Sequence, residues 1–199
     1  MKNVLLLIFI IAACWKLWGG DATVKLGPGV KATDPPQQIL IIKGDPFDFK
    51  GYQITPLADF IIKAKVLSKE NYSIGSDADL VPTDLALGWQ NMSDEAILNK
   101  IEITQSGRWY HWRTDSFPIP RSEIVSQSAN MHLIPENDAI ESAINEVKQG
   151  QIVEMEGYLV RVNSTKGLHW QSSLSRDDSG AGGCEVIFVK RFNIRPVDI

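Results

Sequence analysis

The sequence predicts a single α+β domain that follows an N-terminal membrane anchor and a flexible tether. Three observations lead to this fold class: an apolar run at the start of the chain, a stretch rich in Gly and Pro behind it, and both strand-like and helix-like apolar periods in the remainder. The expected boundaries are 1–18 for a signal-anchor or signal peptide, 19–38 for the tether and 39–199 for one domain. A domain of that length can bury a sizeable core.

The N-terminal segment contains the clearest localisation signal in the chain. Residues 4–14 read VLLLIFIIAAC, behind Lys2 and ahead of WKLW at 15–18. We favour an uncleaved, single-pass anchor, because residues 4–20 reach the lower limit of the roughly 17–25 residues that span a bilayer, and because Trp and Lys settle at lipid headgroups. Two alternatives stay open: a lipoprotein acylated at Cys14, since IAAC resembles a bacterial lipobox, and a cleaved signal peptide. All three place the domain outside the cytoplasm.

The charge balance narrows the class of partner. All 24 acidic residues lie beyond position 20, whereas Lys2 and Lys16 lie before it, so the remaining 18 basic residues leave the exported part with a net charge of −6. This argues against nucleic acid as a partner and against a domain that lies flat on anionic lipid. Cys184 is the lone cysteine of the domain, which excludes an internal disulfide there.

The elements can be assigned in order from residue 19. Residues 19–38 contain four glycines and three prolines, which is typical of a flexible linker. A strand over 60–68 is predicted by apolar residues at a spacing of two: Phe60, Ile62, Ala64 and Val66. Residues 84–89 favour a turn or short helix that supplies core, and Ser93 is the expected N-cap of a helix before residue 101. Strands at 101–105 and 108–113 follow, joined by a turn at 106–107.

The second half contains the strongest helix pattern. Ile140, Ala143, Ile144 and Val147 recur at helical spacing within 137–148, and Gly150 ends the pattern. Strands are then expected at 152–161, 169–175 and 184–192, with a loop at 176–183. A helix followed by three antiparallel strands indicates a helix packed on an antiparallel sheet, curved or partly closed toward a barrel.

Several segments together carry a resemblance. They are GPGV at 27–30, DLALGW at 84–89, MSD at 92–94, SANMHLIP at 128–135 and the stretch from Ser172 to Glu185. In these segments the chain resembles a group of uncharacterised, membrane-anchored exported bacterial proteins. The resemblance implies a bacterial inner-membrane protein whose domain faces the periplasm or the exterior. It brings no known activity, so the candidate sites depend on their own residues.

The loop before Cys184 is the first candidate site. Asp177 and Asp178 could bind a cation, and Cys184 behind a glycine-rich loop could act as a nucleophile. We favour a hairpin loop with a packed Cys184, because the spacing is not that of an EF-hand and no neighbour in sequence activates the thiol. A pairing of Cys184 with His132 or His169 remains a weak catalytic candidate.

A metal centre is not expected from the histidines. His111, His132 and His169 lie in separate segments and lack the local spacing that presets ligands on a helix. No cofactor is therefore predicted.

The sequence RWYHWR at 108–113 is the best candidate binding surface. Alternation places Trp109, His111 and Arg113 on one face of a strand and Arg108, Tyr110 and Trp112 on the other. Trp, Tyr and Arg are typical of recognition hot spots, and exposed aromatic rings also stack on sugars. The competing interpretation is that the tryptophans belong to the core.

The sequence thus favours a non-enzymatic binding module of the cell envelope, with an envelope protein or glycan as partner. The alternative is an envelope hydrolase or transferase that uses Cys184 with a histidine, or a metal held by histidines.

Overall fold

The computed structural model of this chain describes residues 23–75, 77–164, 167–175 and 184–196. The predicted anchor, Cys14, and the loop residues Asp177 and Asp178 lie outside these ranges. Across the described ranges, no helix has the length and apolarity needed to cross a bilayer.

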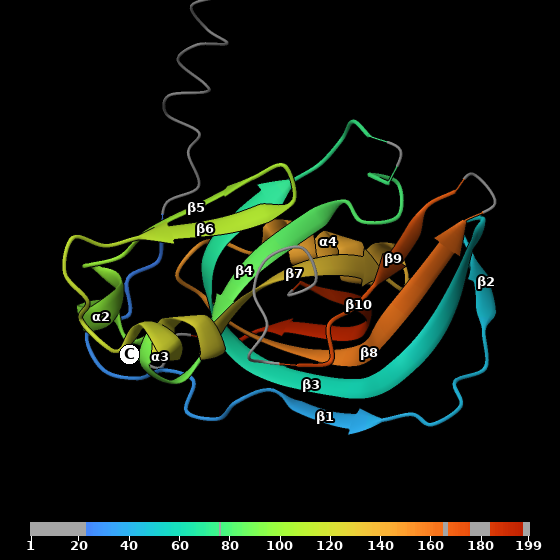
Figure 1. The fold of residues 1–199 in the computed structure, drawn as a ribbon. Helices are drawn as coiled ribbons and strands as arrows, with labels where there is room; N and C mark the ends of the chain where they lie inside the picture. Colours follow the sequence, from blue (N-terminus) through green and yellow to red (C-terminus); the bar gives the residue numbers. More distant parts are fainter. Residues whose placement is uncertain (1–22, 76, 165–166, 176–183, 197–199) are drawn as a thin grey trace, which may run out of the picture.

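The described chain is rich in strands and has few helices (Figure 1). In chain order the elements are β1 (Gln37–Leu40), β2 (Phe47–Phe49), β3 (Tyr52–Asn71), β4 (Thr83–Gly88), the 3-10 helix η1 (Gln90–Ser93), α2 (Glu95–Leu98), β5 (Glu102–Ser106), β6 (Trp109–Arg113), α3 (Arg121–Ser126), β7 (Ser128–Pro135), α4 (Asp138–Glu146), β8 (Ile152–Ser164), β9 (His169–Gln171) and β10 (Glu185–Ile194). The strand expected at 169–175 is shortened to β9, whereas β3 and β8 are longer than predicted.

Five strands form a ring. β3 pairs with β4, β4 with β7, β7 with β10, β10 with β8, and β8 again with β3. β7 and β10 run parallel and the other four pairs are antiparallel, so the sheet is mixed rather than purely antiparallel as predicted. A helical crossover, α4, and strand β8 intervene between β7 and β10, which gives the chain the length that a parallel pair requires.

The long strand β3 makes the ring possible. Its residues 52–65 pair with β8 and its residues 65–71 pair with β4, with irregularities in register after Pro56 and Val66. Such bulges bend a strand and increase its twist, which lets one strand serve two neighbours.

The interior of the ring holds the main core. The four residues predicted to share one face of β3, Phe60, Ile62, Ala64 and Val66, do so. They belong to one cluster with apolar side chains of the other ring strands: Leu85, Leu87, Met131, Leu133, Val153, Met155, Leu159, Ile187 and Val189. Ile144 of α4, which is 2% exposed, belongs to the same cluster. α4 begins where predicted, because the Asn137 side chain accepts hydrogen bonds from the Ala139 and Ile140 amides.

Residues 84–89 supply core as predicted, since Leu85, Leu87 and Trp89 belong to the interior cluster, but the turn or short helix expected there is wrong. They lie in strand β4 and the turn after it, not in a helix, and every residue of β4 is buried. A strand buried on both faces does not alternate, so periodicity could not identify it. Ser93 is likewise not a helix N-cap, since Asp94 caps α2 through the Ala96 amide.

The middle of the predicted tether is bound to the domain. We call residues 24–32 the strap. The Leu26 and Gly27 amides donate to Glu95 at 2.6 and 2.9 Å, and the Lys31 and Ala32 amides donate to Ser93 Oγ, each at 3.0 Å. The prediction of a flexible linker does not hold for the strap, because its acceptors lie more than sixty residues away in sequence and leave no local pattern.

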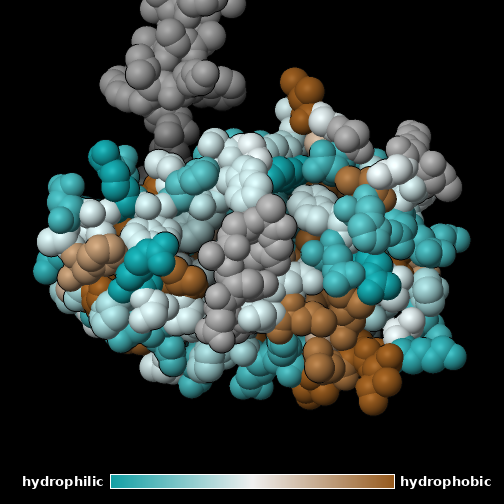
Figure 2. Space-filling model, in the orientation of Figure 1, coloured by the Kyte–Doolittle hydropathy of each residue, from teal (hydrophilic) through white to brown (hydrophobic). Residues whose placement is uncertain are grey.

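Apolar side chains gather on one part of the surface (Figure 2). Around the edge strand β1, the exposed ones are Ile39, Leu40, Ile42 and Ile61.

Candidate functional site

A cavity of about 310 Å³ lies between the β5–β6 hairpin, β7, β9 and the start of β10. We call it the Trp170 cavity. It is lined by Arg108, Trp109, His132, His169, Trp170, Gln171 and Cys184. The fold therefore brings together five residues that the sequence singled out in three separate candidate sites.

The hairpin turn places Arg108. Gly107 and Arg108 both have positive φ, at 57° and 70°, as in a type I′ turn. The left-handed conformation is costly for a residue with a Cβ, on the order of 1 kcal/mol. It is held by two hydrogen bonds: the Arg108 amide donates to Tyr72 Oη at 3.0 Å, and Asn130 Nδ2 donates to the Arg108 carbonyl at 3.1 Å.

The Arg108 guanidinium makes three polar contacts within the protein. Nη1 donates to Asp84 Oδ1 at 2.9 Å, while Nη2 contacts Asp77 Oδ2 at 3.0 Å and the Val81 carbonyl at 2.9 Å. Its Cζ atom lies over the Tyr72 ring, 3.6 Å from the ring centre. Arg108 is thus a structural link between the hairpin and the ring, and its charge is already matched by carboxylates.

Asp84 and His132 form a buried polar pair behind the cavity. They are neighbours across the β4–β7 ladder and are 0% and 2% exposed. His132 Nδ1 lies 2.9 Å from Asp84 Oδ1, in an orientation that does not align a hydrogen bond, and Asp84 Oδ2 has no hydrogen-bond partner among the described residues. The His132 ring also contacts the Trp170 ring, with centroids 4.5 Å apart.

Tyr72 remains a neutral phenol in this environment. Burial and the nearby Asp84 carboxylate raise the pKa of Tyr72 to about 12, against smaller opposing effects of Arg108. Its hydroxyl therefore keeps its proton, while the hydroxyl oxygen accepts the hydrogen bond from the Arg108 amide.

The remaining RWYHWR residues alternate as predicted, but they do not form one surface. Trp109, His111 and Arg113 are exposed on the outer face, and Trp109 alone of these lines the cavity. Tyr110 and Trp112 point inward and are partly buried against a separate apolar cluster. Tyr110 donates to Ser128 Oγ at 3.1 Å, and burial raises the pKa of Tyr110 to about 12.

Two of the three histidines share the Trp170 cavity with Cys184. His132 and His169 line the Trp170 cavity and His111 does not. In the described ranges, no three His, Cys, Asp or Glu side chains are grouped so as to hold a metal ion. Cys184 is half-buried and shares the cavity with both histidines, so the structure keeps the thiol–imidazole candidates in one place.

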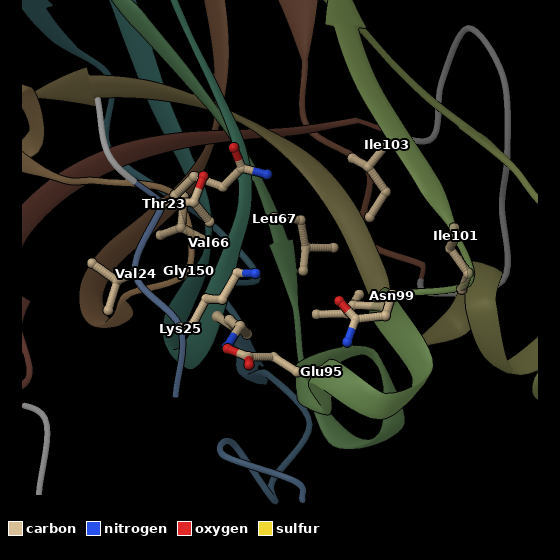
Figure 3. Close-up of a pocket in the computed structure, with 13 residues that line it drawn as sticks. Thr23, Val24, Lys25, Val66, Leu67, Glu95, Asn99, Ile101, Ile103 and Gly150 are labelled. Atoms are coloured by element: carbon tan, nitrogen blue, oxygen red, sulfur yellow. The ribbon is translucent and has the colours of Figure 1, made fainter. Parts of the chain in front are cut away.

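A second, smaller pocket of about 200 Å³ lies under the strap (Figure 3). Lys65 alternates with the core residues Ala64 and Val66 along β3, yet it is only 3% exposed and donates to Glu95 Oε1 at 2.8 Å. Burial raises the pKa of Glu95, but the hydrogen bonds from Lys65, Leu26 and Gly27 outweigh it and leave the pKa of Glu95 below its usual value. The pair holds the strap in place.

Sequence reasoning missed two residues of the cavity lining, Trp170 and Gln171. It also missed the three side chains that contact Arg108, which are Tyr72, Asp77 and Asp84. For Asp84 a signal exists, because an acidic residue inside the run DLALG is costly to bury without a partner.

Comparisons of this chain with protein-family models, with curated proteins and with solved structures give no match.

Proposed function

We propose that this protein is a membrane-anchored, extracytoplasmic binding module of the bacterial envelope and that the Trp170 cavity is its ligand site. The observation that carries the site is a polar set at the cavity: Arg108 and His132 line it, and both lie within 3 Å of the fully buried Asp84 carboxylate. Burying ions is expensive, and apolar residues would stabilise the same position equally well or better. A retained polar set beside an opening is therefore typical of recognition.

The strand connectivity supports this location. Numbered along the chain, the ring strands have the order 1-2-3-5-4-1 with strands 3 and 5 parallel, which corresponds to the connectivity of the OB-fold. OB-folds bind ligands on strands 2 and 3 and on the loops between strands 1 and 2 and between strands 4 and 5. The Trp170 cavity lies on the equivalent part of this ring, at β7 and β9. The likeness concerns architecture, and the function depends on the site itself.

We extend the proposal to the fold. α4 acts as a helix that packs against the ring and covers one end of a partly closed barrel. Its Ile144 and the following Val147 join the interior cluster, which supports this arrangement.

Location is tested with the full-length protein in its host membranes. An uncleaved anchor predicts that the protein stays in the membrane fraction at high salt and that its intact mass includes residues 1–20. A mass that corresponds to a chain beginning at an acylated Cys14 would refute the uncleaved anchor and support the lipoprotein alternative. Recovery of the protein in the soluble fraction would refute both.

The site is tested by capture from solubilised envelopes. Trp170→Ala should abolish recovery of the bound component, whereas His111→Ala, an exposed residue of the same hairpin that does not line the cavity, should leave it unchanged. Equal recovery by both variants would refute the site.

The second candidate function is thiol-dependent acyl transfer or hydrolysis, favoured by the shared cavity of Cys184 and His132. It predicts rapid labelling of native Cys184 by a thiol reagent at neutral pH and complete loss of function in Cys184→Ala. The binding module predicts slow labelling of the native protein, fast labelling after denaturation, and retained function in the same variant.

A further inference from the structure

We infer that the Trp170 cavity binds a neutral sugar unit of a glycan chain, which stacks on the indole rings and forms a hydrogen bond between a hydroxyl and His132. This rests on the proposed function, because it names the ligand class of the same site. The inference is built from the charge, the hydrogen-bonding groups and the shape of the cavity walls.

The charge of the walls selects a neutral ligand. Arg108 is the permanently charged residue among those that line the cavity, and its donors are directed at Asp84, Asp77 and the Val81 carbonyl. An anionic ligand would have to displace these carboxylates, and a cation would meet the guanidinium.

The hydrogen-bonding groups suit a polyhydroxylated ligand. His132 Nδ1 lies 2.9 Å from Asp84 Oδ1 without an aligned hydrogen bond, and His132 lines the cavity. An imidazole exchanges hydrogen bonds with hydroxyl groups through its ring nitrogens. Gln171 is complementary: its Oε1 accepts from Arg161 Nε at 2.8 Å, which leaves its amide hydrogens to donate. The lining therefore includes an imidazole and a carboxamide, two groups that exchange hydrogen bonds with hydroxyls.

The aromatic walls supply the apolar contact. Trp109 is 42% exposed on the hairpin, and Trp170 lies on the opposite segment, β9, against the His132 ring. Aromatic faces attract polarised C–H groups, and a sugar ring presents such groups on the face from which its hydroxyls point away. The volume of about 310 Å³ is at the lower end of the range for small-ligand sites, so we expect one sugar ring inside and the rest of the chain outside.

The test uses the full-length protein in detergent and neutral probes. Chitotetraose and maltotetraose are titrated by calorimetry, with free N-acetylglucosamine and the acidic tetragalacturonate for comparison. We expect at least one neutral tetrasaccharide to bind, at least tenfold tighter than tetragalacturonate. Binding should weaken at least tenfold in Trp170→Ala and in Trp109→Ala, and stay unchanged in His111→Ala. Trp109 lies at the surface, so its variant keeps the test valid should Trp170→Ala fail to fold.

The outcomes separate this inference from the proposed function. Tighter binding of the tetrasaccharide than of the monosaccharide supports a glycan chain as the ligand. Equal binding refutes recognition of a glycan chain but is consistent with recognition of a single sugar unit. Binding of tetragalacturonate alone, or of no probe, overturns the inference. If Trp170-dependent capture from envelopes persists in that case, the proposed function stands; if capture is also absent, both fail.

Discussion

Removing the Arg108 side chain should be among the most destabilising changes at the surface of this protein. Arg108→Ala eliminates three contacts of 2.9 to 3.0 Å, to Asp84, Asp77 and the Val81 carbonyl, and the stacking on Tyr72. Asp84 is 0% exposed, so its carboxylate would remain buried without a cation. Breaking a buried pair in this way costs about 3–5 kcal/mol. Because the Arg108 side chain is 18% exposed and water can enter in its place, we expect the lower end, about 3 kcal/mol.

The same hairpin offers a matched control. Arg113 pairs with Glu102 at 2.8 Å, but both side chains are largely exposed, at 80% and 57%. An exposed pair contributes about 0–1 kcal/mol, so Arg113→Ala should change the free energy of unfolding by less than 1 kcal/mol.

Urea unfolding of the purified full-length variants, followed by far-UV circular dichroism, measures the difference. Adding Asp84→Asn to Arg108→Ala removes the uncompensated charge and should recover part of the loss. If Arg108→Ala and Arg113→Ala agree within about 0.5 kcal/mol, the pair does not stabilise the fold and the reasoning is wrong.

Three further changes test other parts of the structure. Ile144→Asp places a carboxylate at a position that is 2% exposed in the core, and should cost several kcal/mol of stability by urea unfolding; an unchanged midpoint would show that the assigned face of α4 is wrong. Glu95→Gln should remove the part of the acid sensitivity of the stability that comes from Glu95. The folded pKa of Glu95 is lowered, so its contribution is present above the ordinary value of 4.5 and is lost as the pH falls through the folded value; thermal unfolding between pH 7 and pH 3 should be flatter in the variant. Gly150→Ala should displace the strap, since a Cβ there lies 1.8 Å from the Val24 carbonyl oxygen at a φ of +90°; unchanged protection of the Val24 amide against hydrogen exchange would refute this.

The elements that sequence predicts well are those with an unambiguous period. The alternation from Phe60 to Val66 and the helical spacing around Ile144 each reflect one buried face. In the structure, both sets of residues contribute to the interior cluster. Strand β4 could not be predicted in this way, because it is buried on both faces. The ring depends on pairings between strands far apart in sequence, which no local pattern records.

The candidate site was predicted in parts. Arg108, Trp109, His132, His169 and Cys184 were each identified by residue type, but only the fold assigns them to one cavity and leaves His111 outside. Arg108 was expected to serve recognition directly, whereas its guanidinium is held by Asp84 and Asp77. The strap was missed for the same physical reason: a backbone amide bonded to Glu95 has no signature in the sequence around it.

The bound strap also shortens the segment that connects the domain to the predicted anchor. A free linker over 19–38 would let the domain range on the order of 60 Å from the bilayer at about 3.3 Å per residue. With the strap seated from Val24 onward, only residues 19–23 separate it from the predicted anchor, and their contour is on the order of 20 Å. If the predicted anchor spans the bilayer, this contour would keep the domain close to the membrane, and a target would have to approach the lipid surface to reach it.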